Sequence, residues 1–128
     1  MGELTTGVNW LAVGIGAVLS FGLGALWFSP MMFGEKWAAG VGIEMGEGAT
    51  QPKAALVLQL VGTCLLAWLI GIAAASDALM LAILITLTIS VLMIASGLFD
   101  GNGHYAAVVE GVFPSVMFVI MMLCHAVL

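Results

Sequence analysis

The sequence predicts an all-α integral membrane protein: an antiparallel bundle of four transmembrane helices with a short interfacial segment after the first. Of the 128 residues, 63% are hydrophobic and 7% are charged, whereas about a quarter of the residues of soluble domains are charged. Four long stretches carry almost no charge, and about 20 apolar residues are enough to cross a bilayer. These stretches are residues 8–28, 54–75, 79–99 and 105–128, within a single membrane domain spanning 1–128.

The first span, residues 8–28, is free of charged residues, and a helix of this length is about 31 Å long, close to the thickness of bilayer hydrocarbon. Trp10 and Trp27 lie near its two ends, at the depths that indoles favour. Small residues recur at intervals of four and form a stripe that lets another helix approach closely. This stripe consists of Gly16, Ser20 and Gly24.

The connection at residues 29–53 divides into two parts. Its first half alternates apolar side chains with Glu35 and Lys36, which predicts a short helix lying in the membrane interface. Its second half is rich in glycine and predicts a flexible hydrated loop. The only two basic residues, Lys36 and Lys53, both belong to this connection, so the positive-inside rule assigns it to the cytoplasm. We therefore expect a protein of the bacterial inner membrane with periplasmic termini.

The second and third spans carry small-residue stripes of the same kind. A short break at residues 76–77 separates these spans, and a turn signal at 100–103 precedes the fourth, so neighbouring helices are expected to run in opposite directions. The stripe of the second span is Thr63, Ala67 and Gly71, and that of the third is Ala82, Thr86 and Ser90.

The fourth span contains a carboxylate, Glu110, one turn before Pro114. Proline removes the helical hydrogen bond to the carbonyl four residues back, here that of Glu110. Ionisable residues inside a membrane are candidate functional residues. Glu110 and Gln59 are expected at similar depths, so one interpretation is an acid linked to proton or substrate movement and hydrogen-bonded to Gln59. The alternative is a carboxylate at headgroup level that contacts water.

Soft metal ligands also lie on one face of the fourth span, and Cu(I) prefers such ligands. Methionine is nevertheless a common packing residue, so packing is the competing interpretation. His104 and His125 are each able to ligate a haem or chlorophyll-type centre, but they lie near opposite ends of one helix. No cofactor is predicted, and pigment, haem and copper stay open. The soft ligands are Met117, Met121, Cys124 and His125.

Several classes of function find no support in the sequence. Nucleic-acid binding requires clustered basic residues, and a cleaved signal peptide requires a positively charged segment before a shorter apolar run. No catalytic triad, glycine-rich phosphate loop or zinc motif is present, so the protein is not predicted to be an enzyme. Cys64 and Cys124 are expected at depths too different for a disulfide, as buried apolar thiols.

Three short motifs resemble the signature of a bacterial family of small four-helix membrane proteins catalogued as a domain of unknown function, DUF1761. They are NWLAV at residues 9–13, ALWFSP at 25–30 and FGEKW at 33–37. Residues 99–101 are similar to a later family motif, although the basic residues that often follow it are absent here. The resemblance implies a fold and a membrane location, and it supplies no catalytic residues.

Three hypotheses for function follow. The first is an accessory or structural subunit that packs through the small-residue stripes into a larger membrane complex or a homo-oligomer. The second is a small oligomeric transporter or channel that uses Glu110 next to Pro114. The third is a pigment- or metal-associated membrane subunit. The expected partners are the lipid bilayer and other membrane subunits or further copies of the chain, with no nucleic acid.

Overall fold

The computed structural model describes residues 2–29, 32–42 and 53–128, and all regular structure in them is helical. Four of the described helices are long and apolar enough to cross a membrane, which confirms the predicted fold class. They are α2 (Trp10–Trp27), α4 (Lys53–Ala75), α5 (Leu79–Phe99) and α6 (His104–Val127). Two shorter helices are α1 (Gly2–Thr5) and α3 (Gly34–Val41). Most of the predicted glycine-rich loop lies outside the described residues.

The helix ends follow local sequence signals. Asn9 caps α2, because its side-chain oxygen accepts a hydrogen bond of 3.2 Å from the backbone N–H of Ala12. This cap begins the helix at Trp10, two residues later than residue 8, the predicted start. Between α4 and α5, Asp77 adopts a φ of 53°, a left-handed conformation that aspartate tolerates better than most residues. Gly101, with a φ of 85°, also adopts a left-handed conformation, in the turn between α5 and α6.

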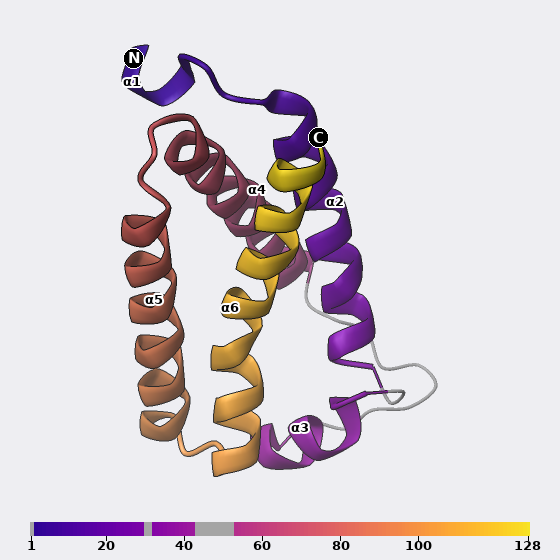
Figure 1. Cartoon of the computed structure of the whole chain (residues 1–128). Coiled ribbons are helices and arrows are strands. Elements are labelled where there is room, and N and C mark those ends of the chain that lie inside the picture. Colours follow the sequence, from indigo (N-terminus) through magenta and orange to yellow (C-terminus); the bar gives the residue numbers. More distant parts are fainter. Residues whose placement is uncertain (1, 30–31, 43–52) are drawn as a thin grey trace.

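The bundle has two ends, which differ in what lies there (Figure 1). Both termini lie at one end, together with the α4–α5 connection, and we call it the terminal end. Helix α3 and the α5–α6 turn lie at the opposite end, which we call the α3 end. The side chains agree with this arrangement. A Cβ atom on Gly71, near the end of α4, would lie 3.5 Å from the His125 ring near the end of α6.

Helix α6 is the centre of the bundle. It contacts α2, α3, α4 and α5. In its most apolar stretch of 18 residues, 50% of the residues are buried, whereas the corresponding share in α5 is 17%. The close approach to α5 depends on glycine. A Cβ atom on Gly111 of α6 would collide with Ile94, and one on Gly97 of α5 would lie 3.1 Å from the Cβ of Ala107. The hydroxyls of Ser90 and Ser115 add a hydrogen bond of 2.7 Å between these helices.

Neither cysteine forms a disulfide, but one of them is not buried. Cys124 lies among the buried residues of α6, whereas Cys64 is exposed on α4. The expectation that both thiols are buried is therefore wrong for Cys64. Cys64 directly follows the buried Thr63 and is turned about 100° from it around the helix, off the buried face.

Candidate functional site

Glu110 lies in the second turn of α6, half-buried and directed toward α3. Its Oε1 accepts a hydrogen bond of 2.7 Å from the indole Nε1–H of Trp37, on α3 and 73 residues away in sequence. A hydrogen bond to an ionised carboxylate is about twice as strong as a neutral one. The carboxylate of the span thus joins α3 to the central helix.

The sequence predicted Gln59, rather than Trp37, as the hydrogen-bond partner of Glu110. Gln59 lies in the second turn of α4 with its side chain exposed, and its backbone carbonyl accepts a hydrogen bond from the Thr63 hydroxyl at 2.7 Å. Within the described residues the carboxylate of Glu110 bonds to Trp37 rather than to Gln59. Pro114 follows one turn later on α6 and is buried. It leaves the backbone carbonyl of Glu110 without its helical donor.

Six aromatic side chains pack together near the start of α6, and we call them the aromatic cluster. They come from the end of α2, from α3 and its approach, and from α6. Each ring lies within 6.5 Å, centroid to centroid, of another ring of the set. The members are Trp27, Phe28, Phe33, Trp37, Tyr105 and Phe113.

The inner part of the aromatic cluster is packed between α2 and α6. Trp27 and Phe113 are buried, with ring centroids 5.7 Å apart. The indole Nε1–H of Trp27 donates a hydrogen bond of 3.1 Å to the backbone carbonyl of Val109. Trp27, predicted as a depth marker at the membrane interface, is therefore part of the contact between two helices.

The outer part of the aromatic cluster is accessible. Phe28, Phe33 and Trp37 are partly buried, and Tyr105 is 44% exposed. The ammonium group of Lys36 lies 5.4 Å from the centroid of the Tyr105 ring, within the range of a cation–π interaction. The ammonium group of Lys36 thus already lies over one ring of the aromatic cluster, that of Tyr105.

Backbone contacts hold α3 in place. The N–H of Gly103, which precedes α6, donates a hydrogen bond of 3.0 Å to the carbonyl of Gly40. A Cβ atom on Gly40 would lie 2.6 Å from the Cβ of Ala106, so only glycine fits between the two helices. Helix α3 thus packs on the start of α6 (Figure 1). This packing brings Trp37 to Glu110.

The predicted small-residue stripe of α2 lies against α6. Ser20 is fully buried, and Cβ atoms on Gly16 and Gly24 would lie 3.3 Å from Met121 and 3.2 Å from Phe113. Two residues of this stripe therefore receive large side chains of the central helix.

The other two stripes also face inward. In α4, Ala67 is 1% exposed, and a Cβ atom on Gly71 would lie 2.6 Å from Val13 of α2. In α5, Ala82 and Thr86 are buried, and Ser90 bonds to α6. None of the three predicted stripes is left free on the outer surface of the described chain.

The soft ligands of α6 take part in packing. Met117, Met121 and Cys124 are each less than 10% exposed. The Met117 sulfur lies 3.9 Å from the Thr63 hydroxyl. His125 packs beside Gly71, far from the exposed His104 at the start of the helix. Among the described residues, no group of three or more His, Cys, Asp or Glu side chains is arranged to hold a metal ion.

Comparison with protein families assigns the chain to one family. A family model described as "Protein of unknown function (DUF1761)" matches residues 11–126. The chain belongs to this family. The match confirms the resemblance found in the motifs of the first span and of α3. Searches among curated proteins and among solved structures give no match.

One residue of the site, Trp37, was absent from the predicted site residues, although it lies in the DUF1761 motif FGEKW. The amphipathic character of residues 33–37 is the sequence feature that points to Trp37. An indole beside Glu35 and Lys36 has a polar N–H that requires a hydrogen-bond acceptor. The sequence does not state which acceptor is used. That depends on how α3 folds back on α6.

Proposed function

We propose that this protein is the subunit of a small membrane carrier in which Glu110 binds the transported solute or a proton. The observation that carries this proposal is the 2.7 Å hydrogen bond between Trp37 and the half-buried carboxylate of Glu110. A carboxylate within a span is costly and is retained where it has a task. Pro114 supports the same proposal, because broken helical bonding commonly occurs beside transport sites.

The carrier is proposed to lie in the bacterial inner membrane with the α3 end in the cytoplasm. Lys36 in α3 and Lys53 at the start of α4 support this orientation, because basic residues are enriched on the cytoplasmic side. Glu110 would then be reached from the cytoplasm, and both termini would be periplasmic.

Reconstituted vesicles test the carrier. We expect solute-driven proton flux, followed with a pH-sensitive dye inside the vesicles across a panel of charged and neutral solutes. Glu110→Gln should abolish this flux, because an amide neither takes up a proton nor balances a cation. The matched control is Glu35→Gln, which removes an exposed carboxylate of α3 and should leave the flux unchanged. Equal flux in Glu110→Gln, or no flux by the unmutated protein with any solute, would refute the carrier.

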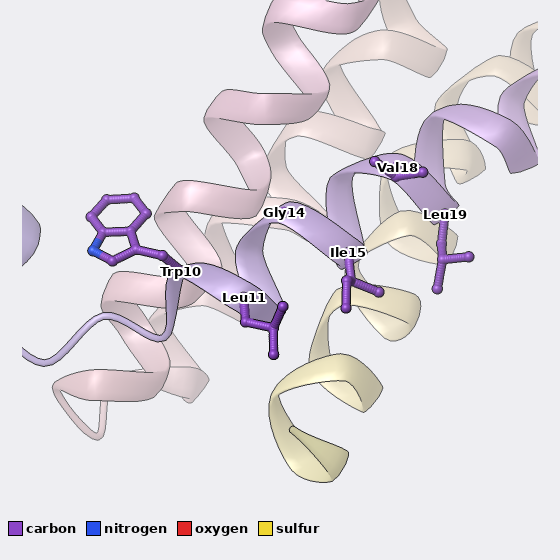
Figure 2. A pocket seen from close by; sticks show the side chains of 6 residues that line it. All are labelled: Trp10, Leu11, Gly14, Ile15, Val18 and Leu19. Atoms are coloured by element: carbon purple, nitrogen blue, oxygen red, sulfur yellow. The ribbon is translucent and has the colours of Figure 1, made fainter.

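A second candidate is an accessory or structural subunit. The predicted stripes no longer support it, since they are used inside the chain, but the outer face of α2 does. This face forms a shallow apolar hollow (Figure 2), and a Cβ atom on Gly14 would meet nothing within 4 Å. A small residue in an open position allows another helix to approach. The hollow is lined by Trp10, Leu11, Gly14, Ile15, Val18 and Leu19.

Gentle extraction tests the accessory subunit. A partner or second copy seated on α2 should be retained in mild detergent, detected by mass measurement, and lost in Gly14→Leu. Gly62→Leu is the matched control, because Gly62 of α4 is equally open. A monomer without any co-purifying protein at every detergent concentration would count decisively against this candidate.

A further inference from the structure

We propose that Glu110 and the accessible rings of the aromatic cluster bind a lipophilic organic cation, such as a quaternary ammonium or a phosphonium group. This inference rests on the proposed carrier function and names the class of solute for the same site. Three observations carry it: a carboxylate without a counter-ion, an aromatic cluster that contacts this carboxylate through Trp37, and a lysine already stacked on one ring of the cluster.

The carboxylate supplies the charge. Within the described residues, Glu110 has one hydrogen-bond partner, the neutral indole of Trp37, and forms no ion pair. Ionisable residues in membrane spans commonly pair with one another. The ammonium of Lys36, on the residue next to Trp37, is directed to Tyr105 instead. The site therefore has a negative charge available for a cation from outside.

The rings supply the affinity for an organic cation. A cation within about 6 Å of a ring centroid is attracted by the negative face of the ring, and quaternary ammonium ions are commonly bound in this way. Phe28 and Trp37 have centroids 4.8 Å apart, and Trp37 contacts the carboxylate directly. Both side chains are only partly buried, so their remaining surface is accessible to a ligand.

Lys36 shows that a cation fits on the cluster. Its Nζ lies 5.4 Å from the Tyr105 centroid, and the Tyr105 ring lies 6.5 Å from Phe33. A metal ion is a poorer match, because Mg²⁺ and Ca²⁺ require six or more oxygen ligands, whereas aromatic faces suit a weakly hydrated cation. The cluster is thus suited to an organic cation.

The binding test uses the full-length protein in a maltoside detergent, which carries no ammonium group, with tetraphenylphosphonium as the probe. Tetraphenylborate, of the same shape and opposite charge, is the control ligand. We expect saturable quenching of tryptophan fluorescence by tetraphenylphosphonium alone. Glu110→Gln should weaken binding by at least about tenfold, and Glu35→Gln should not change it. Equal affinity in Glu110→Gln, or equal binding of the borate, would overturn the proposal.

Two further variants separate a binding role from a structural one. Lys36→Gln frees the ring of Tyr105, so tetraphenylphosphonium should bind several-fold more tightly. Trp37→Phe keeps a ring but removes the N–H that competes for the carboxylate, so binding should persist. Circular dichroism and size-exclusion chromatography verify folding of each variant. Weaker binding in folded Lys36→Gln would contradict the assignment of Tyr105 to the site.

The bound cation has two potential sources, a free solute or the ammonium headgroup of a lipid. Nanodiscs of a neutral glycolipid and of phosphatidylethanolamine, which both lack net charge, distinguish them. Equal affinity for tetraphenylphosphonium in both discs supports a free cation, whereas several-fold weaker binding in phosphatidylethanolamine assigns the site to the headgroup. Glu110-dependent proton flux without cation binding would refute the ligand class alone, and cation binding without flux would refute the carrier alone.

Discussion

The two ends of the bundle use tryptophan in different ways. At the α3 end, Trp27 and Trp37 are buried or partly buried, and each indole donates to α6, to a backbone carbonyl or to the carboxylate of Glu110. At the terminal end, Trp10 is 51% exposed and lies 6.2 Å from the ring of Trp68. The indole of Trp68 donates to the carbonyl of Leu4 in the short helix α1.

This difference shows that residues of one type serve different purposes at the two ends. At the terminal end, the indoles of Trp10 in α2 and Trp68 in α4 contact each other, and the N–H of Trp68 reaches only the short helix α1. At the α3 end, the indoles connect the central helix α6 to α2 and to α3, and one of them is bound to the carboxylate of Glu110. We therefore expect substitutions at the α3 end to cost more stability, and to affect Glu110, more than matched substitutions at the terminal end.

Among the matched pairs of substitutions at the two ends, the largest effect is expected from Gly40→Ala. The new Cβ would lie 2.6 Å from the Cβ of Ala106, which has no rotamer that moves it away. Gly71→Ala at the terminal end makes an equally short contact, but with a methyl of Val13, which is able to rotate. We predict a loss of about 3 kcal/mol for Gly40→Ala and a smaller one for Gly71→Ala. Unfolding by sodium dodecyl sulfate in mixed micelles measures both, and equal losses would contradict the comparison.

An intermediate effect is expected from the indole hydrogen bonds themselves. Trp37→Phe removes a donor from a carboxylate and should lower the free energy of unfolding by about 2 kcal/mol. Trp68→Phe removes a donor from a neutral, exposed carbonyl and should cost less than about 1 kcal/mol. The same unfolding titration applies. A larger loss for Trp68→Phe would reverse the roles assigned to the two ends.

The smallest effect is expected where a helical glycine faces open space. Gly14 in α2 and Gly62 in α4 face open space, so alanine meets no atom within 4 Å at either position. Gly14→Ala and Gly62→Ala should each leave stability unchanged or raise it by up to about 1 kcal/mol, because glycine in a helix gives the unfolded chain extra freedom. A clear loss of stability in detergent would reveal a packing contact that the bundle does not contain.

The sequence predicted the fold class because hydropathy and turn residues are local properties. The third span illustrates this, since residues 79–99 were predicted and α5 is Leu79–Phe99. Hydropathy did not reveal which helix is central. Helix α5 is more apolar than α6, with mean hydropathies of 2.5 and 2.1, yet far less of it is buried. In a membrane the most apolar helix favours lipid, and the helix with polar and small residues favours protein neighbours.

The candidate site was predicted only in part. Glu110 and Pro114 stand out because a carboxylate and a proline are rare inside a span. The partner of Glu110 was not predictable, because the Trp37 contact depends on α3 folding back across 73 residues of sequence. The fit of Gly40 against Ala106 and its backbone bond to Gly103 arise from the same tertiary arrangement. Periodicity within one helix carries no information about such contacts.

The hydrogen bond between Trp37 and Glu110 is tested most directly by nuclear magnetic resonance of the tryptophan indoles in nanodiscs. The Nε1–H resonance of Trp37, assigned by its loss in Trp37→Phe, should lie downfield because its acceptor is a carboxylate 2.7 Å away. In Glu110→Gln this resonance should move upfield, while that of Trp68 stays in place. A Trp37 resonance at the same position in both proteins would contradict the account.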